Sequence, residues 1–269
     1  MHTIVLTLLN VPKYLPLQAP KPKYSMSKKR LGFRQIKLLF IKLVLSLFLL
    51  SVVWVLMYRW VAPPATLHMI KRRAEAGAEN RENPAIAYRF VPLEEMSPQL
   101  PLAVVASEDQ LFLEHNGFDV SAIMDAFKRN QKGGNIRGGS TISQQVAKNV
   151  FLWHGRSYLR KAVEAYFTLL IEMLWGKQRI MEVYLNIAEM GDGVFGVEAV
   201  SQKYFKKPAS DVGRQQAALL AAVLPNPIKF SAKNPSGYTL RRRARIARAM
   251  GRLGGTTYIK AILPAEDEK

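Results

Sequence analysis

A long uncharged segment near the N-terminus limits how this chain can fold. Residues 43–58 read LVLSLFLLSVVWVLMY and contain only Ser46 and Ser51 as polar residues. With its flanks the segment covers residues 38–61, and a bilayer core of about 30 Å needs roughly 20 residues of helix. A buried core helix normally carries a polar stripe, which this segment lacks. The segment therefore predicts a membrane-spanning helix.

The charges around this segment predict its orientation. Residues 1–37 form a basic tail with eight Lys and Arg residues, and the first carboxylate of the chain is Glu75. The positive-inside bias places residues 1–37 in the cytoplasm and the chain from residue 62 onward outside it. The apolar core is longer than that of a signal peptide, and Pro63 and Pro64 disfavour cleavage, so we expect an uncleaved anchor.

The first residues of the chain show no structural pattern. Four prolines break residues 1–25, whereas Met26 opens a compact basic flank, Met-Ser-Lys-Lys-Arg, before the apolar segment. We therefore expect translation to begin at Met26.

The composition narrows the class of protein. The net charge of +19 is concentrated at the start, since residues 1–74 hold 13 of the 39 basic residues and none of the 20 acidic ones. Charge gathered around an apolar segment favours a membrane over nucleic acid as partner. The absence of cysteine excludes disulfides, zinc ribbons, iron–sulfur clusters and a cysteine nucleophile.

The rest of the chain reads as an all-α domain. We expect a juxtamembrane linker over residues 62–90, a domain over residues 91–255 and a C-terminal tail over residues 256–269. Helical spacing or composition predicts helices over residues 102–115, 121–130, 140–152, 158–175, 177–190, 197–204, 214–223 and 239–253. Glycine and proline pairs separate these segments, and no run of alternating strands occurs.

A carboxylate pair, Glu108-Asp109, lies in an otherwise apolar segment, AVVASEDQLF. In the predicted helix Glu108, Phe112 and His115 share one face. Apolar surroundings raise the pKa of a carboxyl group, as a general acid or base near neutral pH requires. Taken alone, this segment is better explained by a solvated helix face with a structural histidine.

A glycine-led segment, GGSTISQQVAKN, covers residues 138–149. Ser140 or Thr141 can cap the helix that follows, whose free N–H groups favour an anion. Thr141, Gln145 and Lys148 form one polar stripe that suits a sugar carrying phosphate. The loop lacks the Gly-Lys-Ser/Thr ending of a nucleotide-binding loop, which disfavours ATP.

A third segment adds Arg156, Arg160, Lys161 and Glu164. Arg160 and Glu164 are four residues apart, and one interpretation is a surface salt bridge worth a few tenths of a kcal/mol. The functional interpretation is a guanidinium cluster that binds a diphosphate.

Together these segments resemble the successive motifs of the peptidoglycan glycosyltransferases. The matching text is EDxxFxxHxGFD from Glu108, GGSTISQQVAKN and RSYLRKxxE, followed by IMEVYLN, GDGVFGVEA, AALLAAVLPNP and the helix of Arg241 and Arg242. The similarity runs in order over residues 90–253. With the anchor and the short chain, the similarity is to the monofunctional biosynthetic transglycosylases of this family.

The resemblance implies a lysozyme-like fold, with helices in two lobes around a cleft, and the synthesis of glycan strands from lipid II. In the family's inverting reaction, an acceptor 4-hydroxyl displaces the lipid diphosphate from the donor. Glu108 matches the general base, and Glu164 matches a second essential carboxylate that orients arginines or holds a divalent cation such as Mg²⁺. No organic cofactor is implied. Matching substrate-binding positions are Asp109, Phe112, His115, Ser140, Thr141, Gln144, Gln145, Lys148, Asn149, Arg156 and Arg160, of which Phe112 and His115 could equally be structural.

The same resemblance places the protein in the bacterial inner membrane, with a cytoplasmic N-terminus and a periplasmic catalytic domain. It implies lipid II, the growing glycan strand and other cell-wall synthesis or division proteins as partners, and no nucleic acid. The chain lacks the Lys-Thr-Gly motif of transpeptidases, and its one Ser-x-x-Lys, Ser25 to Lys28, precedes the anchor, so we expect no peptide cross-linking. A lysozyme-like enzyme that cleaves glycan with Glu108 as general acid and a non-catalytic lipid-binding scaffold are the alternatives.

Overall fold

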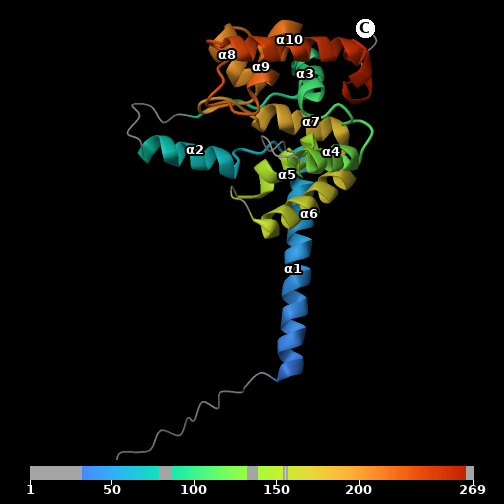
Figure 1. Ribbon diagram of the computed structural model, residues 1–269. Coiled ribbons are helices and arrows are strands. Elements are labelled where there is room, and N and C mark those ends of the chain that lie inside the picture. The colour runs from blue at the N-terminus through green and yellow to red at the C-terminus, as the bar shows by residue number, and fades with distance from the viewer. Residues whose placement is uncertain (1–31, 79–85, 132–138, 154, 156, 265–269) are drawn as a thin grey trace, which may run out of the picture. The chain divides into compact units, whose positions relative to one another are not determined.

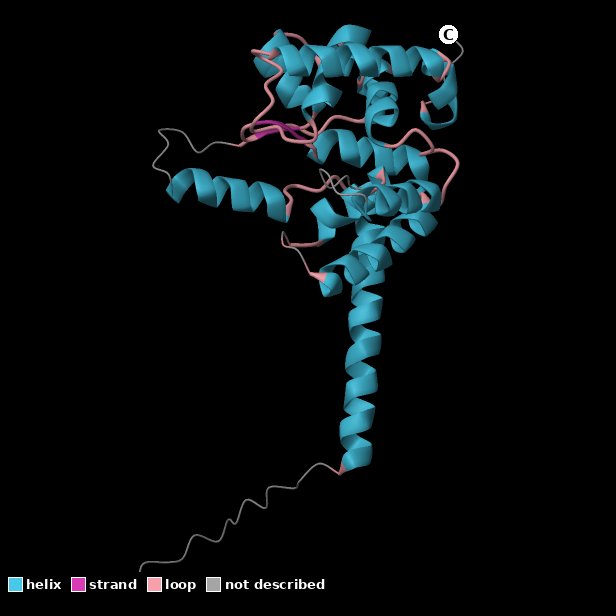
Figure 2. Cartoon of the chain, in the orientation of Figure 1, coloured by secondary structure: helices cyan, strands magenta, loops and turns pink. Residues whose placement is uncertain are grey.

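The computed structural model describes residues 32–78, 86–131, 139–153, 155 and 157–264. Figures 1 and 2 show that these residues are mostly helical. The chain divides into two compact units, residues 1–47 and 48–269. Met26 and most of the predicted basic tail lie outside the described residues.

The first unit contains the N-terminal part of helix α1, Phe33–Trp60. Its described residues, 32–47, are all exposed and mostly apolar. Within α1, which is described over its whole length, Val55 is the only buried residue, so α1 is not a core helix. By length and composition α1 is the one helix in the described part of the chain that could cross a membrane, which makes it a candidate anchor.

The second unit begins inside α1, because residues 48–60 pack against the helices that follow. The ring of Trp54 meets that of Phe151 edge to face, with ring centres 5.2 Å apart. The indole Nε1 of Trp175 donates a hydrogen bond of 2.7 Å to the carbonyl oxygen of Val55. The C-terminal turns of α1 are therefore part of the folded domain.

Two groups of helices form the body of this domain. The helices are α2 (Leu67–Ala78), α3 (Gln99–Glu108), α4 (Val120–Gln131), α5 (Ile142–Phe151), α6 (Tyr158–Leu174), α7 (Gly176–Ile187), α8 (Val197–Phe205), α9 (Arg214–Val223) and α10 (Gly237–Arg252). Short 3₁₀ segments are η1 (Leu93–Glu95), η2 (Ala209–Asp211) and η3 (Gly255–Ile262). Helices α3, α9 and α10 pack together, as do α5, α6 and α7, and α3 also contacts α7 (Figure 1). The predominantly helical fold is as predicted.

A small sheet supplements the helices. Its strands are β1 (Ala87–Tyr88), β2 (Glu189–Gly191) and β3 (Val194–Phe195), in the order β1-β3-β2. Strand β1 runs parallel to β3, and β2 runs antiparallel to it (Figure 2). The sequence did not reveal this sheet because strands of two or three residues are too short to show an alternating pattern.

The helix predicted over residues 102–115 is wrong at its C-terminal end. Helix α3 ends at Glu108, because Asp109 has φ −159° and ψ 81° and leaves the helical region. The Asp109 carboxylate accepts a hydrogen bond of 3.0 Å from the backbone N–H of Ile142, the first residue of α5. A tertiary contact thus ends the helix, and Phe112 and His115 lie on the turns that follow rather than on one helical face with Glu108.

The predicted linker and tail also differ from the structure. Residues 62–90 contain α2 and β1, and the Thr66 hydroxyl caps α2 by accepting a hydrogen bond from the Met69 N–H at 3.2 Å. Within the predicted tail, η3 buries Ile259 and Ile262 in the core. Both segments are part of the domain because their apolar side chains are buried against it.

Candidate active site

Glu108 is positioned at the last residue of α3, where its side chain leaves the apolar helix. The side chain is 16% exposed. Its Oε2 accepts a hydrogen bond from Gln145 Nε2 at 3.3 Å, and Arg242 Nη2 lies 3.5 Å from its Oε1. Burial raises the pKa of Glu108, although the contacts with Gln145 and Arg242 partly oppose this effect. A carboxyl group with a raised pKa is suited to accept a proton near neutral pH.

The amide of Gln145 has a fixed orientation behind this carboxylate. The hydroxyl of the buried Tyr184 donates to Gln145 Oε1 at 3.3 Å, which leaves the amide NH₂ to face Glu108. Burial raises the pKa of Tyr184 well above its usual value, and the charges of Glu108 and Asp109 add to this effect. Tyr184 therefore remains a hydrogen-bond donor at physiological pH.

A cavity of about 290 Å³ lies beside Gln145. Its wall includes three side chains from α5 that the sequence predicts as substrate-binding, namely Gln145, Lys148 and Asn149. Burial lowers the pKa of Lys148, an effect that Glu164 opposes and that the neighbouring cations reinforce. An ammonium group that is desolvated beside a cavity is favourable for an anionic ligand.

Cations surround the second predicted carboxylate, Glu164, which is buried on α6. Arg160 Nη1 donates to Glu164 Oε2 at 2.6 Å, and Lys161 Nζ donates to Glu164 Oε1. Lys161 Nζ also lies 3.5 Å from Ser140 Oγ. Arg160 Nε is buried and has no hydrogen-bond partner among the described residues, so it retains a free donor. Arg160 and Lys161 also line a second cavity of about 420 Å³.

Three of the predicted site residues hold the turn after Glu108. His115 Nε2 lies 2.9 Å from Asp109 Oδ1, and the Gly117 N–H points to His115 Nδ1 at 3.2 Å. Because Nδ1 accepts, the neutral ring carries its proton on Nε2 and donates it to Asp109. Phe112 is fully buried. These contacts favour the structural interpretation of Phe112 and His115, and a substrate contact of Asp109 stays a prediction.

Thr141 and Gln144 cap the N-terminus of α5. Thr141 Oγ1 accepts from the Gln144 N–H at 3.2 Å and donates to the Gly117 carbonyl oxygen at 2.7 Å. Gln144 Oε1 accepts from the Thr141 N–H at 3.0 Å, which completes a capping box. The Thr141 hydroxyl and the Gln144 Oε1 are thus engaged within the protein, and direct substrate contacts from these two residues stay predictions. Arg156 lies outside the described residues.

Two side chains that contact Glu108 or its partner Gln145 were not predicted as site residues. Arg242 belongs to the last motif of the resemblance, yet only the fold brings it to Glu108, 134 residues earlier. Tyr184 belongs to the IMEVYLN motif and shows no polar role in the sequence, because its hydroxyl lies on an otherwise apolar helix face.

A partly buried carboxyl group with a raised pKa beside a cationic cavity, in a helical domain that follows an apolar helix, fits a class of enzyme that transfers a group from an anionic donor. Residues 78–251 match the transglycosylase family, and the chain belongs to that family. A biosynthetic peptidoglycan transglycosylase of Pasteurella multocida is 54% identical over 212 residues, which cover 79% of this chain and 85% of the relative. Proteins of the same name from Pseudomonas syringae and Pseudomonas putida are 51% and 52% identical, over 79% and 78% of this chain and 89% and 88% of their own lengths.

Proposed function

We propose that this protein polymerises peptidoglycan glycan strands and that Glu108 is its general base. The family and the names of the relatives support the activity. The observation that carries the residue assignment is the contact of Glu108 with Gln145, whose side chain also lines the cavity of Lys148. Gln145 thus lies between the proposed proton acceptor, Glu108, and the cavity proposed to hold the anionic leaving group. Neither the family nor these relatives support a glycan-cleaving enzyme or a lipid-binding scaffold.

The reaction that fits this arrangement is an inverting glycosyl transfer. The acceptor 4-hydroxyl attacks the anomeric carbon of lipid II or of the lipid-linked strand, and its proton passes to a carboxylate oxygen of Glu108. A new glycosidic bond forms as the bond from the anomeric carbon to the lipid diphosphate breaks, and the diphosphate leaves with both electrons. The amide of Gln145 and the guanidinium of Arg242 orient the Glu108 carboxylate.

The cations on α5 and α6 support the departure of the diphosphate. Negative charge grows on the leaving oxygen, so the charges of Lys148 and Arg160 stabilise the transition state more than the bound substrate. Glu164 holds Arg160 in place through their ion pair. Both carboxylate oxygens of Glu164 already have cationic partners, and no group of three or more acidic or histidine side chains among the described residues could hold a metal ion. The carboxylate oxygens of Glu164 therefore do not fit a resident Mg²⁺ as ligands, and we derive no step through such an ion.

The test uses purified protein with fluorescent lipid II in detergent. We expect long products that muramidase converts to disaccharide units, and loss of these products in Glu108→Gln. Cleavage of preformed glycan by the wild type would instead indicate the lytic enzyme. Binding of lipid II without turnover by the wild type would indicate a scaffold.

We further propose that α1 anchors the protein in the inner membrane with a cytoplasmic N-terminus. Support comes from the apolar length of α1 and the basic residues before it. Because the chain has no cysteine, Ser27→Cys and the exposed Ser210→Cys each introduce a single thiol. In intact spheroplasts, an impermeant maleimide should label position 210 and spare position 27, and the reverse pattern would refute this orientation. Contacts with other cell-wall synthesis or division proteins stay a prediction.

A further inference from the structure

Helix α2 lies almost entirely before the segment that matches the family, which begins at residue 78. In the structure α2 contacts α5, the helix that carries Lys148. The imidazole of His68, in the first turn of α2, lines the same cavity of about 290 Å³ as Lys148 and Asn149. A side chain from outside the matched segment therefore forms part of the wall of the candidate site.

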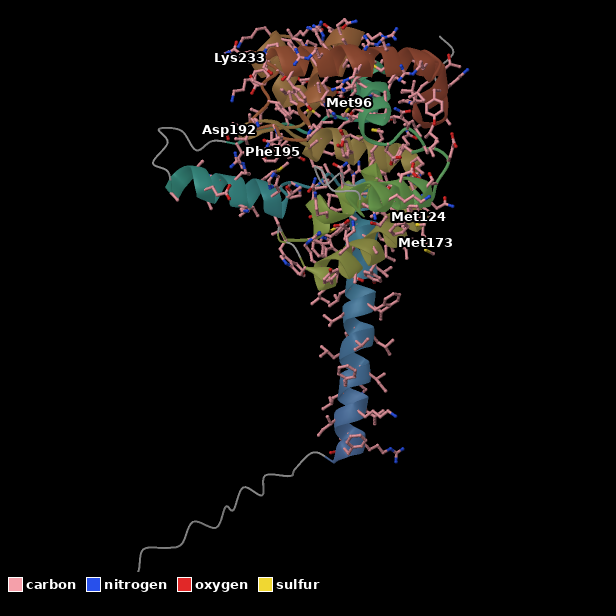
Figure 3. All side chains as sticks on the ribbon, viewed as in Figure 1. Met96, Met124, Met173, Asp192, Phe195 and Lys233 are labelled. Atoms are coloured by element: carbon pink, nitrogen blue, oxygen red, sulfur yellow. The ribbon has the colours of Figure 1, made fainter. Side chains whose placement is uncertain are left out.

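His68 is held firmly at this position. Its Nε2 lies 2.9 Å from Glu189 Oε2, and its ring meets the ring of Phe195 nearly edge to face, with centres 5.5 Å apart. Figure 3 shows Phe195 and Asp192 beside α2. The His68 side chain is nevertheless 22% exposed. An oriented imidazole that retains an open surface beside a cation is suited to contact a ligand.

Arg72, one turn further along α2, fastens the helix to the domain. Its Nε donates to Glu189 Oε1 at 3.0 Å, and its Nη2 pairs with Asp192. The N–H of Gly193 also donates to Glu189 Oε1, at 3.1 Å. Burial raises the pKa of Glu189, but the hydrogen bonds from His68 and Arg72 outweigh this effect and leave the pKa below its usual range. Glu189 is thus ionised at neutral pH and binds the side chains of both His68 and Arg72.

We propose that α2 is a wall of the substrate site, in which His68 contacts the sugar-diphosphate part of the substrate beside Lys148. Arg72 acts as a positioning residue, because it reaches the site only through Glu189. This inference rests on the proposed function and deepens it, since it assigns substrate contact to the segment that joins the anchor to the matched domain.

The experiment measures lipid II binding by the full-length chain in detergent, in a Glu108→Gln background that prevents turnover. His68→Gln keeps a donor for Glu189 but loses the ring, and Lys71→Ala changes an exposed residue of the same helix. We expect His68→Gln to weaken binding about 10-fold, the effect of one lost hydrogen bond to a charged group, while its melting temperature stays unchanged. Lys71→Ala should bind like the parent.

Steady-state kinetics give a second readout, with the same substitutions made in the active protein that retains Glu108. His68→Gln should raise KM for lipid II about 10-fold with kcat within twofold. Arg72→Met should raise KM similarly and lower the melting temperature, and Arg72→Lys should recover part of both. Unchanged binding and KM in His68→Gln, with a parent that binds lipid II, would overturn the inference alone. A parent that binds no lipid II and a wild type that makes no glycan would overturn the proposed function as well.

Discussion

Replacing Glu108 with glutamine removes the proposed proton acceptor while it preserves the size of the side chain. The glutamine oxygen can still accept the hydrogen bond that Gln145 Nε2 now donates to Glu108 Oε2 at 3.3 Å. A general base contributes about 10²–10⁴-fold to a rate, which corresponds to about 2.7–5.4 kcal/mol in the activation barrier. We therefore expect kcat to fall by that factor while KM for lipid II changes little.

The same substitution should change the pH dependence of stability. Burial raises the pKa of Glu108 in the folded protein, so the unfolded chain releases this proton at a lower pH, near the usual value of about 4.3. Above that pH the ionised carboxylate lowers the free energy of unfolding, up to the folded-state pKa, where the penalty levels off. Glutamine carries no charge and avoids this penalty. The stability of Glu108→Gln relative to the wild type should therefore rise from pH 4 to pH 8.

The assay combines turnover of fluorescent lipid II with thermal unfolding across this pH range. The matched control is Glu114→Gln, because Glu114 is an exposed carboxylate shortly after Glu108. It should leave turnover near that of the wild type. Wild-type kcat in Glu108→Gln would refute the role of Glu108 as base. A relative stability that falls between pH 4 and pH 8 would refute the reasoning from burial.

Three further substitutions test other contacts of the domain. Arg242→Met removes a positive charge that lowers the pKa of Glu108, so the acidic limb of the kcat/KM profile should move to higher pH; an unmoved limb would contradict this coupling. Trp175→Phe removes the hydrogen bond to the Val55 carbonyl and should cost about 0.5–1.5 kcal/mol, seen as a melting temperature lower by a few degrees. Gly117→Ala places a methyl group on a residue with φ +88°, 2.7 Å from a side-chain carbon of α6, and should destabilise by about 2–5 kcal/mol. An alanine variant as stable as the wild type in chemical denaturation would show that this turn relaxes freely.

Local features were predictable wherever the responsible residues are neighbours in the chain. The helix over residues 214–223 matches α9 at both ends. The cap of α5 is local too, since the side chains of Thr141 and Gln144 each accept a hydrogen bond from the other's backbone N–H and form the box that starts the helix. The raised pKa of Glu108 also follows from its neighbours, because α3 is buried along almost its whole length.

Features that depend on distant partners were not predictable. The end of α3 at Glu108 depends on a hydrogen bond that the Ile142 N–H donates to the Asp109 carboxylate, 33 residues away. The contact of Arg242 with Glu108 joins two residues that are 134 positions apart in the chain. The segment of His68 reads as a linker because its partner, Glu189, lies 121 residues further along.

The sequence by itself determined the helical class, the apolar segment of α1 and the family, and it predicted Glu108 as the base, because periodicity, composition and motifs are properties of adjacent residues. Only the tertiary structure decided which side chains surround Glu108, which predicted site residues are engaged in holding α3 and α5 together, and that α2 reaches the cavity of Lys148. The physical reason is that a hydrogen bond or an ion pair acts over about 3 Å. Which groups come within this distance depends on how the chain folds back on itself, and the spacing of residues along the chain does not show it.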